Sequence, residues 1–132
     1  MERTLKELFL QAIRERNIDR IKSCINLGAD VNIYNNDGFP VLFLSMRWGN
    51  SNMLELFLAQ PNIDVNIRCQ HGSFVSGTAL MRACFSGRTD VVRRLCQAPG
   101  INLNCQNNPG RTAALFAVIH EKLGCVQILS TS

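Results

Sequence analysis

The stretch Gly28-Ala29-Asp30-Val31-Asn32 decides the fold of this chain, because two later stretches repeat its pattern. They are Asn62-Ile63-Asp64-Val65-Asn66 and Gly100-Ile101-Asn102-Leu103-Asn104. The terminal asparagines of the three stretches are 34 and 38 residues apart. A near-constant spacing of about 33 residues is typical of stacked helix-pair repeats. The pattern therefore predicts a repeat protein.

A turn and two helices follow each stretch. Asp37-Gly38 and Pro109-Gly110 are turn signals, since glycine supplies the positive φ that tight turns need. Helical spacing of apolar residues then predicts inner helices at about 41–48, 79–86 and 113–121 and outer helices at about 51–59, 89–97 and 123–130. We expect Gly49 and Gly87 to end the first two inner helices.

An earlier helix pair precedes the first stretch. Its expected core residues are Leu5, Leu8, Phe9, Ala12 and Ile13 in the inner helix and Ile21, Cys24 and Ile25 in the outer helix. A single helix pair cannot bury such faces, so neighbouring pairs must stack. We expect one domain over residues 1–132, with repeats at about 1–32, 33–66, 67–104 and 105–132, the last truncated. Val126, Ile128 and Leu129 are expected to be incompletely covered.

These stretches, in register, resemble the ankyrin-repeat family. Its pattern is an Asp-Gly turn, then Thr-Pro-Leu-His with small residues, then Gly, then Val-Val-x-Leu-Leu, then Gly-Ala-Asp-Val-Asn. Residues 28–32 match the last part in full, residues 37–38 and 110–112 match the first, and residues 78–84 with Gly87 match the middle. The resemblance covers nearly the whole chain. It implies an all-α helix-turn-helix repeat solenoid of about four repeats, with short finger turns and no true sheet.

The chain also departs from the family pattern. The histidine, whose ring in the family hydrogen-bonds the preceding threonine region, is replaced by Phe43, Met81 and Leu115. Phe39-Pro40 stands where Gly-x-Thr is usual, and four extra residues lengthen the finger between Asn66 and Thr78. Loss of the histidine is expected to affect local stability, and the extra residues are expected to make the second finger longer.

The resemblance implies a non-catalytic adaptor or scaffold that binds a protein partner through a concave face of finger tips and inner helices. It requires no cofactor. The partner-binding residues expected on that face are Asn36, Asp37, Phe39, Arg47, Trp48, His71, Phe74, Arg82, Phe85, Ser86, Asn108, Arg111, Ile119 and His120.

Large apolar residues at the ends of the inner helices have two interpretations. Trp48, Phe85 and Ile119 fall there in consecutive repeats, where the family has small or polar residues. Large aromatic residues are usually mostly buried, so they could bend inward and cover the core. Alternatively they form an exposed apolar stripe flanked by arginines. Tryptophan and arginine are residue types that often contribute most of the binding energy at protein interfaces.

The charge distribution indicates the kind of partner. The formal net charge is +4, and the excess of arginine lies between about residues 65 and 120. This favours an acidic protein partner, although a solvated face is the other interpretation. Nucleic-acid binding is disfavoured because the basic residues are spread out and lack stacking aromatics. No apolar run of about 18 residues predicts a membrane span, and without a secretory signal we expect a cytoplasmic or nuclear protein.

The six cysteines are expected to be free thiols, mostly in core positions. Cys69 alone falls in the irregular finger, close to His71. Zinc needs about four ligands, so this pair predicts no metal site. No nucleophile elbow, metalloprotease motif or phosphate loop is present, and we expect no enzyme activity. Two alternatives remain: a piece of a longer repeat array that positions other domains, or a redox or enzymatic role through Cys69. Self-association through the last repeat is also possible.

Overall fold

A computed structural model describes residues 3–47, 51–71, 76–108 and 110–132. In this part of the chain eight α-helices form and no strand does, apart from a single bridge between Tyr34 and Pro40. The helices are α1 (Leu5–Arg14), α2 (Ile18–Asn26), α3 (Val41–Leu44), α4 (Asn52–Leu58), α5 (Ala79–Ser86), α6 (Thr89–Cys96), α7 (Ala113–Ile119) and α8 (Leu123–Ser130).

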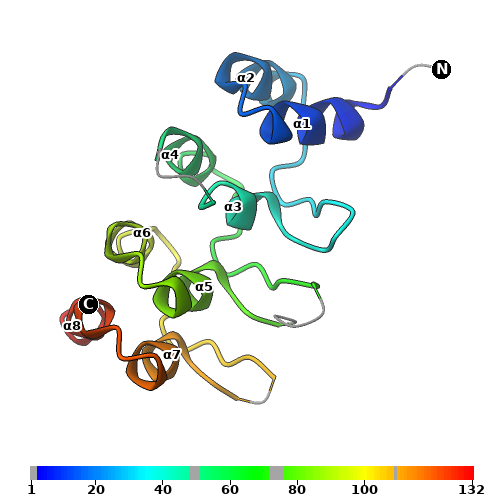
Figure 1. Ribbon diagram of the computed structural model, residues 1–132. Coiled ribbons are helices and arrows are strands. Elements are labelled where there is room, and N and C mark those ends of the chain that lie inside the picture. The colour runs from blue at the N-terminus through cyan, green and yellow to red at the C-terminus, as the bar shows by residue number, and fades with distance from the viewer. Residues whose placement is uncertain (1–2, 48–50, 72–75, 109) are drawn as a thin grey trace. The chain divides into compact units, whose positions relative to one another are not determined.

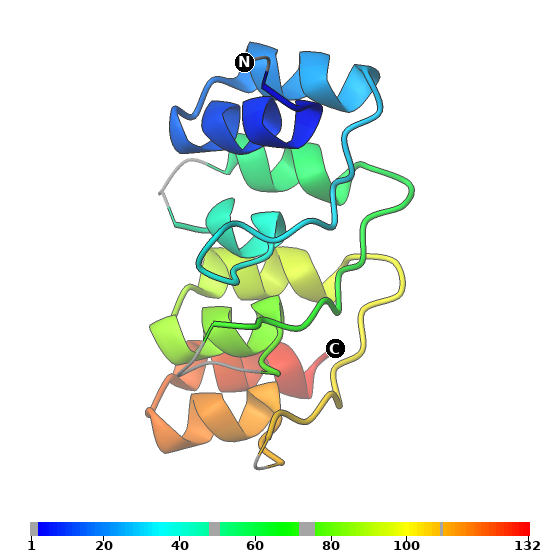
Figure 2. The same ribbon diagram turned by 90° about the vertical axis from the view of Figure 1, so that its right-hand side faces the viewer.

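The chain divides into two compact units, unit 1 (Met1–Ile63) and unit 2 (Asp64–Ser132). In unit 1, α1 packs on α2 and on α3. In unit 2, α5 pairs with α6 and α7 pairs with α8, while α5 also packs on α7 and α6 on α8. The inner helices α5 and α7 thus form one layer and the outer helices α6 and α8 a second (Figures 1 and 2). This confirms the predicted helix-turn-helix repeat fold, while the number of repeats stays a prediction.

Threonine hydroxyls start three of the inner helices. Thr4, Thr78 and Thr112 each accept a hydrogen bond from the backbone N–H three residues later, at 3.2, 3.4 and 3.3 Å. Such caps contribute about 1 kcal/mol each, because they satisfy a donor that the helix leaves unpaired. The caps form although the family histidine is replaced at Met81 and Leu115.

Helix α3 is shorter than predicted. It ends at Leu44, whereas the sequence predicted a helix over residues 41–48. Pro40 stands at its start and makes no side-chain cap. At its end the Ser45 hydroxyl donates to the Leu42 carbonyl, a local bond that competes with helix propagation. The predicted role of Gly49 lies outside the described residues.

The turn from an inner to an outer helix needs a left-handed residue. Gly87 takes this conformation after α5, with φ of 71°, as the sequence predicted. Arg16 and Glu121 take it in the corresponding turns before α2 and α8, with φ of 54° and 56°. Side chains make this conformation costly, so these turns are held by the packing of the helices they join.

The repeated Asp/Asn stretch acts as a clip. Asp30 and Asp64 each accept a hydrogen bond from the N–H of the asparagine two residues later, at 2.9 and 3.0 Å. The asparagine side chains then reach the next loop in their own unit: Asn32 donates to the Asn62 carbonyl at 2.8 Å, and Asn66 to the Gly100 carbonyl at 2.9 Å. The repeated spacing of these residues along the chain therefore sets which loops the asparagine side chains join.

Most expected core residues are buried within their units. In unit 1, Phe9 and Phe57 make an edge-to-face contact with ring centroids 6.1 Å apart. The prediction for Leu8 was wrong, because its side chain is 43% exposed. Leu8 lies one residue before Phe9 on α1, and the step of an α-helix turns it away from the buried face.

Candidate functional site

Inner helix α5 presents three residues to solvent. They are Arg82, Phe85 and Ser86. The remaining residues of α5 are buried. The corresponding positions of α7, counted from the first helical residue, are Phe116, Ile119 and His120. The predicted partner-binding residues among these are exposed, with Phe85 at 41% and Ile119 at 46%, whereas Phe116 is buried.

Four of these residues form a connected group, which we call the aromatic cluster: Arg82, Phe85, Phe116 and His120. The Phe85 ring lies edge-on to His120 at 4.6 Å and to Phe116 at 6.3 Å between centroids. The Arg82 guanidinium carbon lies 5.9 Å from the Phe85 centroid. Phe116 is only 6% exposed and supports the other two rings. Phe85 is therefore fixed in position while much of its ring stays accessible.

Trp48 is not at the position in its repeat that Phe85 and Ile119 occupy in theirs, so the predicted stripe does not align as expected. Counted from the starts of α3, α5 and α7, Arg47, Phe85 and Ile119 occupy the same position. Trp48 stands one position further along and lies outside the described residues, as does Phe74 in the second finger. Phe85 and Ile119 do not bend inward, and Arg47 is likewise exposed.

In unit 1 the predicted residues surround a pocket. It has a volume of about 520 Å³ and lies between α1, the first finger and α3; Asn36, Asp37 and Arg47 contribute to its lining. The Arg47 guanidinium carbon lies 5.4 Å from the centroid of the half-buried Phe39 ring. The structure therefore brings four predicted binding residues of unit 1 together.

The fingers are closed by one side chain each. Asn35 Oδ1 accepts from the N–H of Asp37 at 3.0 Å and of Phe39 at 2.9 Å, and Asn107 Oδ1 accepts from Arg111 N–H at 2.8 Å. At the matching place in the long second finger, Cys69 Sγ accepts from His71 N–H at 3.4 Å. These bonds hold the described parts of the fingers, in which Asn36, Asn108 and Arg111 are exposed and His71 is half-buried.

Cys69 is a buried structural residue. It is 1% exposed, and its backbone N–H and carbonyl bond to Gly77 and Ser76 across the base of the finger. Burial denies the thiol the solvent access that reactive cysteines need, which argues against the redox alternative. The sequence placed Cys69 in an irregular loop and missed that it replaces the asparagine of the other two fingers.

A second group of thiols lies in the core of unit 2. Burial, reinforced by the neighbouring Cys125 and Cys96, raises the pKa of the Cys84 thiol to about 12. Burial also raises the pKa of Cys125, which hydrogen-bonds Cys84. Both groups are therefore neutral hydrophobic packing elements at physiological pH. Across the described ranges, no group of three or more His, Cys, Asp or Glu side chains could hold a metal ion.

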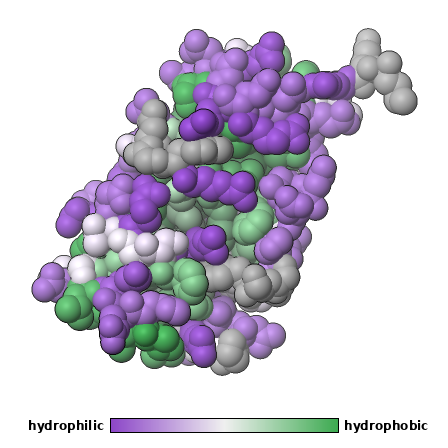
Figure 3. Space-filling view, viewed as in Figure 1, coloured by the Kyte–Doolittle hydropathy of each residue, from purple (hydrophilic) through white to green (hydrophobic). Residues whose placement is uncertain are grey.

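One face of α7 is uncovered. Leu115 and Val118 are 41% and 59% exposed, whereas Met81 and Cys84, at the same positions of α5, are fully buried. These side chains are exposed because no further helix of the described chain covers this face. The side chain of Leu123 in α8 is also exposed, at 72%. Hydrophobic residues gather at the α7–α8 end of unit 2 (Figure 3). We call Leu115, Val118 and Leu123 the terminal face.

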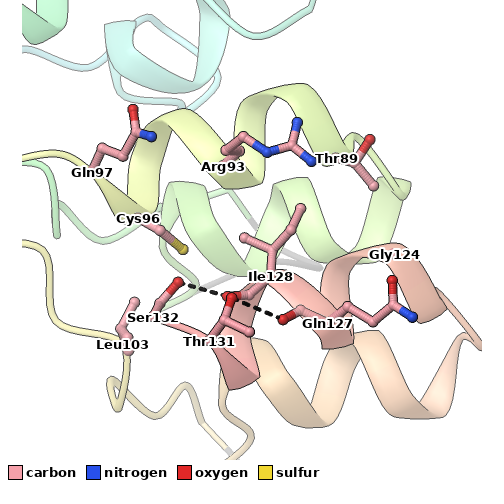
Figure 4. Close-up of a pocket in the computed structure, with 10 residues that line it drawn as sticks. All are labelled: Thr89, Arg93, Cys96, Gln97, Leu103, Gly124, Gln127, Ile128, Thr131 and Ser132. Carbon is pink, nitrogen blue, oxygen red and sulfur yellow. Dashed lines mark hydrogen bonds between the residues drawn. The ribbon is translucent and has the colours of Figure 1, made fainter.

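The outer helices of unit 2 also enclose a hollow of about 650 Å³ between α6 and α8 (Figure 4). Its lining includes Arg93, Cys96 and Ile128. The hydroxyls of Thr131 and Ser132 donate to carbonyls of α8 itself, so these polar groups serve to end the helix. None of the predicted partner-binding residues that the structure describes lines this hollow.

Comparison with known proteins identifies the family. The model for ankyrin repeats matches residues 9–58 and 80–129, which is most of the chain, and the chain belongs to the ankyrin-repeat family. It is also 26% identical, over 126 residues, to a probable serine/threonine-protein kinase from Dictyostelium discoideum. That match covers 92% of this chain and 13% of the kinase. Ankyrin repeats are in general non-catalytic protein–protein interaction modules, and no helix among the described residues is long and apolar enough to cross a membrane.

Proposed function

We propose that this chain binds a protein partner through its finger tips and inner helices, and does so without catalysis. The observation that carries the proposal is the aromatic cluster, in which Phe85 is 41% exposed although three neighbours fix its ring. An apolar ring that is both rigid and accessible loses little conformational entropy when a partner covers it. Such residues dominate the binding energy of protein interfaces.

Charge favours an acidic partner. Unit 2 holds seven Lys and Arg against three Asp and Glu, whereas unit 1 holds seven of each, so unit 2 carries the whole net charge of +4. Arg88 is neutralised by Asp90 at 3.2 Å, and Arg68 donates to two backbone carbonyls. Arg82 and Arg111 are exposed on the proposed binding side. A cytoplasmic or nuclear location remains a prediction.

The proposal is tested by comparing wild-type protein with Phe85→Ala as baits for proteins of the source cell, followed by titration calorimetry with each captured protein. We expect Phe85→Ala to weaken binding by about 2 kcal/mol, since truncation removes the central anchor. Leu27→Ala is the matched control, because it removes an exposed apolar side chain at the end of α2 that belongs to neither the proposed binding residues nor the terminal face. Equal affinity of wild type and Phe85→Ala, at unchanged helical content, would contradict the proposal.

The terminal face favours a second activity, self-association or stacking in a longer repeat array. Leu115 and Val118 are exposed at positions that are buried in the preceding helix pair, and exposed apolar surface of this kind commonly marks an interface. Sedimentation equilibrium of the wild type and Val118→Asp tests self-association. We expect Val118→Asp to be the more monomeric; a wild type that stays monomeric at high concentration rules self-association out.

A further inference from the structure

The pocket of unit 1 combines an apolar floor with a charged rim. Ile13 and Leu44 are 1% and 5% exposed, and half-buried Leu10 lies beside them. Arg14, Arg47 and Asp37 are exposed and stand around this floor. Buried residues of two helices form the floor, so its shape is set by the fold of unit 1.

The rim is held in place as well. The Asn35 side chain accepts two backbone hydrogen bonds and so fixes the finger tip that carries Asp37. Arg47 lies over the Phe39 ring, which restricts its guanidinium group. Planar, restricted guanidinium groups bind carboxylates through paired hydrogen bonds. A carboxylate entering between Arg14 and Arg47 would meet two positive charges and only one acidic side chain, Asp37.

The volume limits what can enter. About 520 Å³ lies within the range of ligand pockets and exceeds a single side chain. A second hollow of about 670 Å³ shares Leu10, Arg14 and Asn36 with the pocket and continues along α1 past Lys6 and Arg3. Two acidic residues line this hollow: Glu15 is paired with Arg20 at 3.7 Å, and Glu7 stands among the three basic residues of the lining. The two hollows therefore offer an extended peptide a continuous track with basic groups along it.

We propose that this pocket anchors an acidic peptide segment of the partner, by taking a large apolar side chain onto Leu10, Ile13 and Leu44 while Arg14 and Arg47 bind an adjacent carboxylate. The proposal rests on the proposed function and names the chemistry that unit 1 recognises. A basic residue beside the apolar one is rejected by the two arginines, and a small apolar residue leaves the floor unfilled.

The test uses three synthetic peptides with the ¹⁵N-labelled full chain: acetyl-Gly-Leu-Glu-Gly-amide and its Glu-to-Gln and Leu-to-Ala analogues. Each is titrated to millimolar concentration while amide shifts are followed by NMR. We expect the Leu-Glu peptide to shift amides of α1, the first finger and α3, and to bind about tenfold more tightly than either analogue. Double substitution of Arg14→Gln and Arg47→Gln should weaken the Leu-Glu peptide by about tenfold.

The matched control is Arg93→Gln with Arg94→Gln, which removes the same charge from outer helix α6. It should bind the Leu-Glu peptide as wild type does. Equal binding of the Gln analogue, equal weakening by the control variant, or no shifts in unit 1 would overturn the proposal. The proposed function would still stand in that case if Phe85→Ala reduces partner affinity while the arginine variants of unit 1 do not.

Discussion

Ser76 occupies a backbone conformation that the other two fingers give to glycine. Its φ is 69°, against 87° for Gly38 and 103° for Gly110. A side chain in this region costs roughly 1 kcal/mol, so we expect Ser76→Gly to raise the free energy of unfolding by about that amount. Urea denaturation followed by circular dichroism measures the change. Gly110→Ser serves as the reciprocal variant and should lower stability; a destabilised Ser76→Gly would refute the argument.

Single residues show how far sequence reasoning reaches. The clip formed by Asp64 and Asn66 is predictable, because a local motif with fixed spacing makes local hydrogen bonds. The role of Cys69 was not, since a thiol stands in place of the asparagine that closes the other fingers, and the residue type alone does not indicate that its sulfur accepts the closing hydrogen bond. Exposure of Phe85 also depends on which neighbours support its ring, and a helix pattern does not specify them.

Helices α5 and α7 provide a paired test of position. Cys84 and Val118 occupy the same place in the two helices, yet Cys84 is fully buried and Val118 is 59% exposed. We expect Cys84→Asp to cost several kcal/mol, about 3 or more, because it buries a charge without a partner. Val118→Asp should change stability by no more than about 0.5 kcal/mol. Thermal unfolding of the two variants decides the matter, and similar losses would show that the terminal face is covered.

Helix bounds were predictable where a cap marks them. Thr78 and Gly87 delimit α5 in the sequence and in the structure. The length of α3 was overestimated. No capping side chain marks its start, and at its end the Ser45 hydroxyl donates to the Leu42 carbonyl. Apolar periodicity indicates which residues could be buried, whereas burial itself depends on the next helix pair.

At the scale of the molecule, each helix pair is stabilised by its neighbours, so stability should vary along unit 2. Pair α5–α6 packs on α7 and α8, while the far face of α7 is open. We expect backbone amides of α7 and α8 to exchange with deuterium faster than those of α5. Native-state hydrogen exchange by NMR measures this, and uniform protection of the four helices would show a single cooperative unit instead.

The family and fold class followed from the sequence because they rest on many weak signals in register. The sequence also showed which part of the chain carries the excess of arginine. It did not show which of these arginines make structural bonds and which lie on the proposed binding side. Arg68 and Arg88 serve local hydrogen bonds and an ion pair, whereas Arg82 and Arg47 lie beside aromatic rings on the proposed binding side. Counting charges does not distinguish these uses.

Asn66 uses both ends of its amide. The nitrogen donates to the Gly100 carbonyl, and the oxygen accepts from the Asn102 N–H at 2.9 Å. Deamidation would turn this group into a carboxylate, which has no proton to donate. Two oxygens would then face each other across the link, and a bond worth about 1 kcal/mol would be lost. Chemical ageing of a single side chain would thus loosen adjacent loops and leave the rest of the covalent chain unaltered.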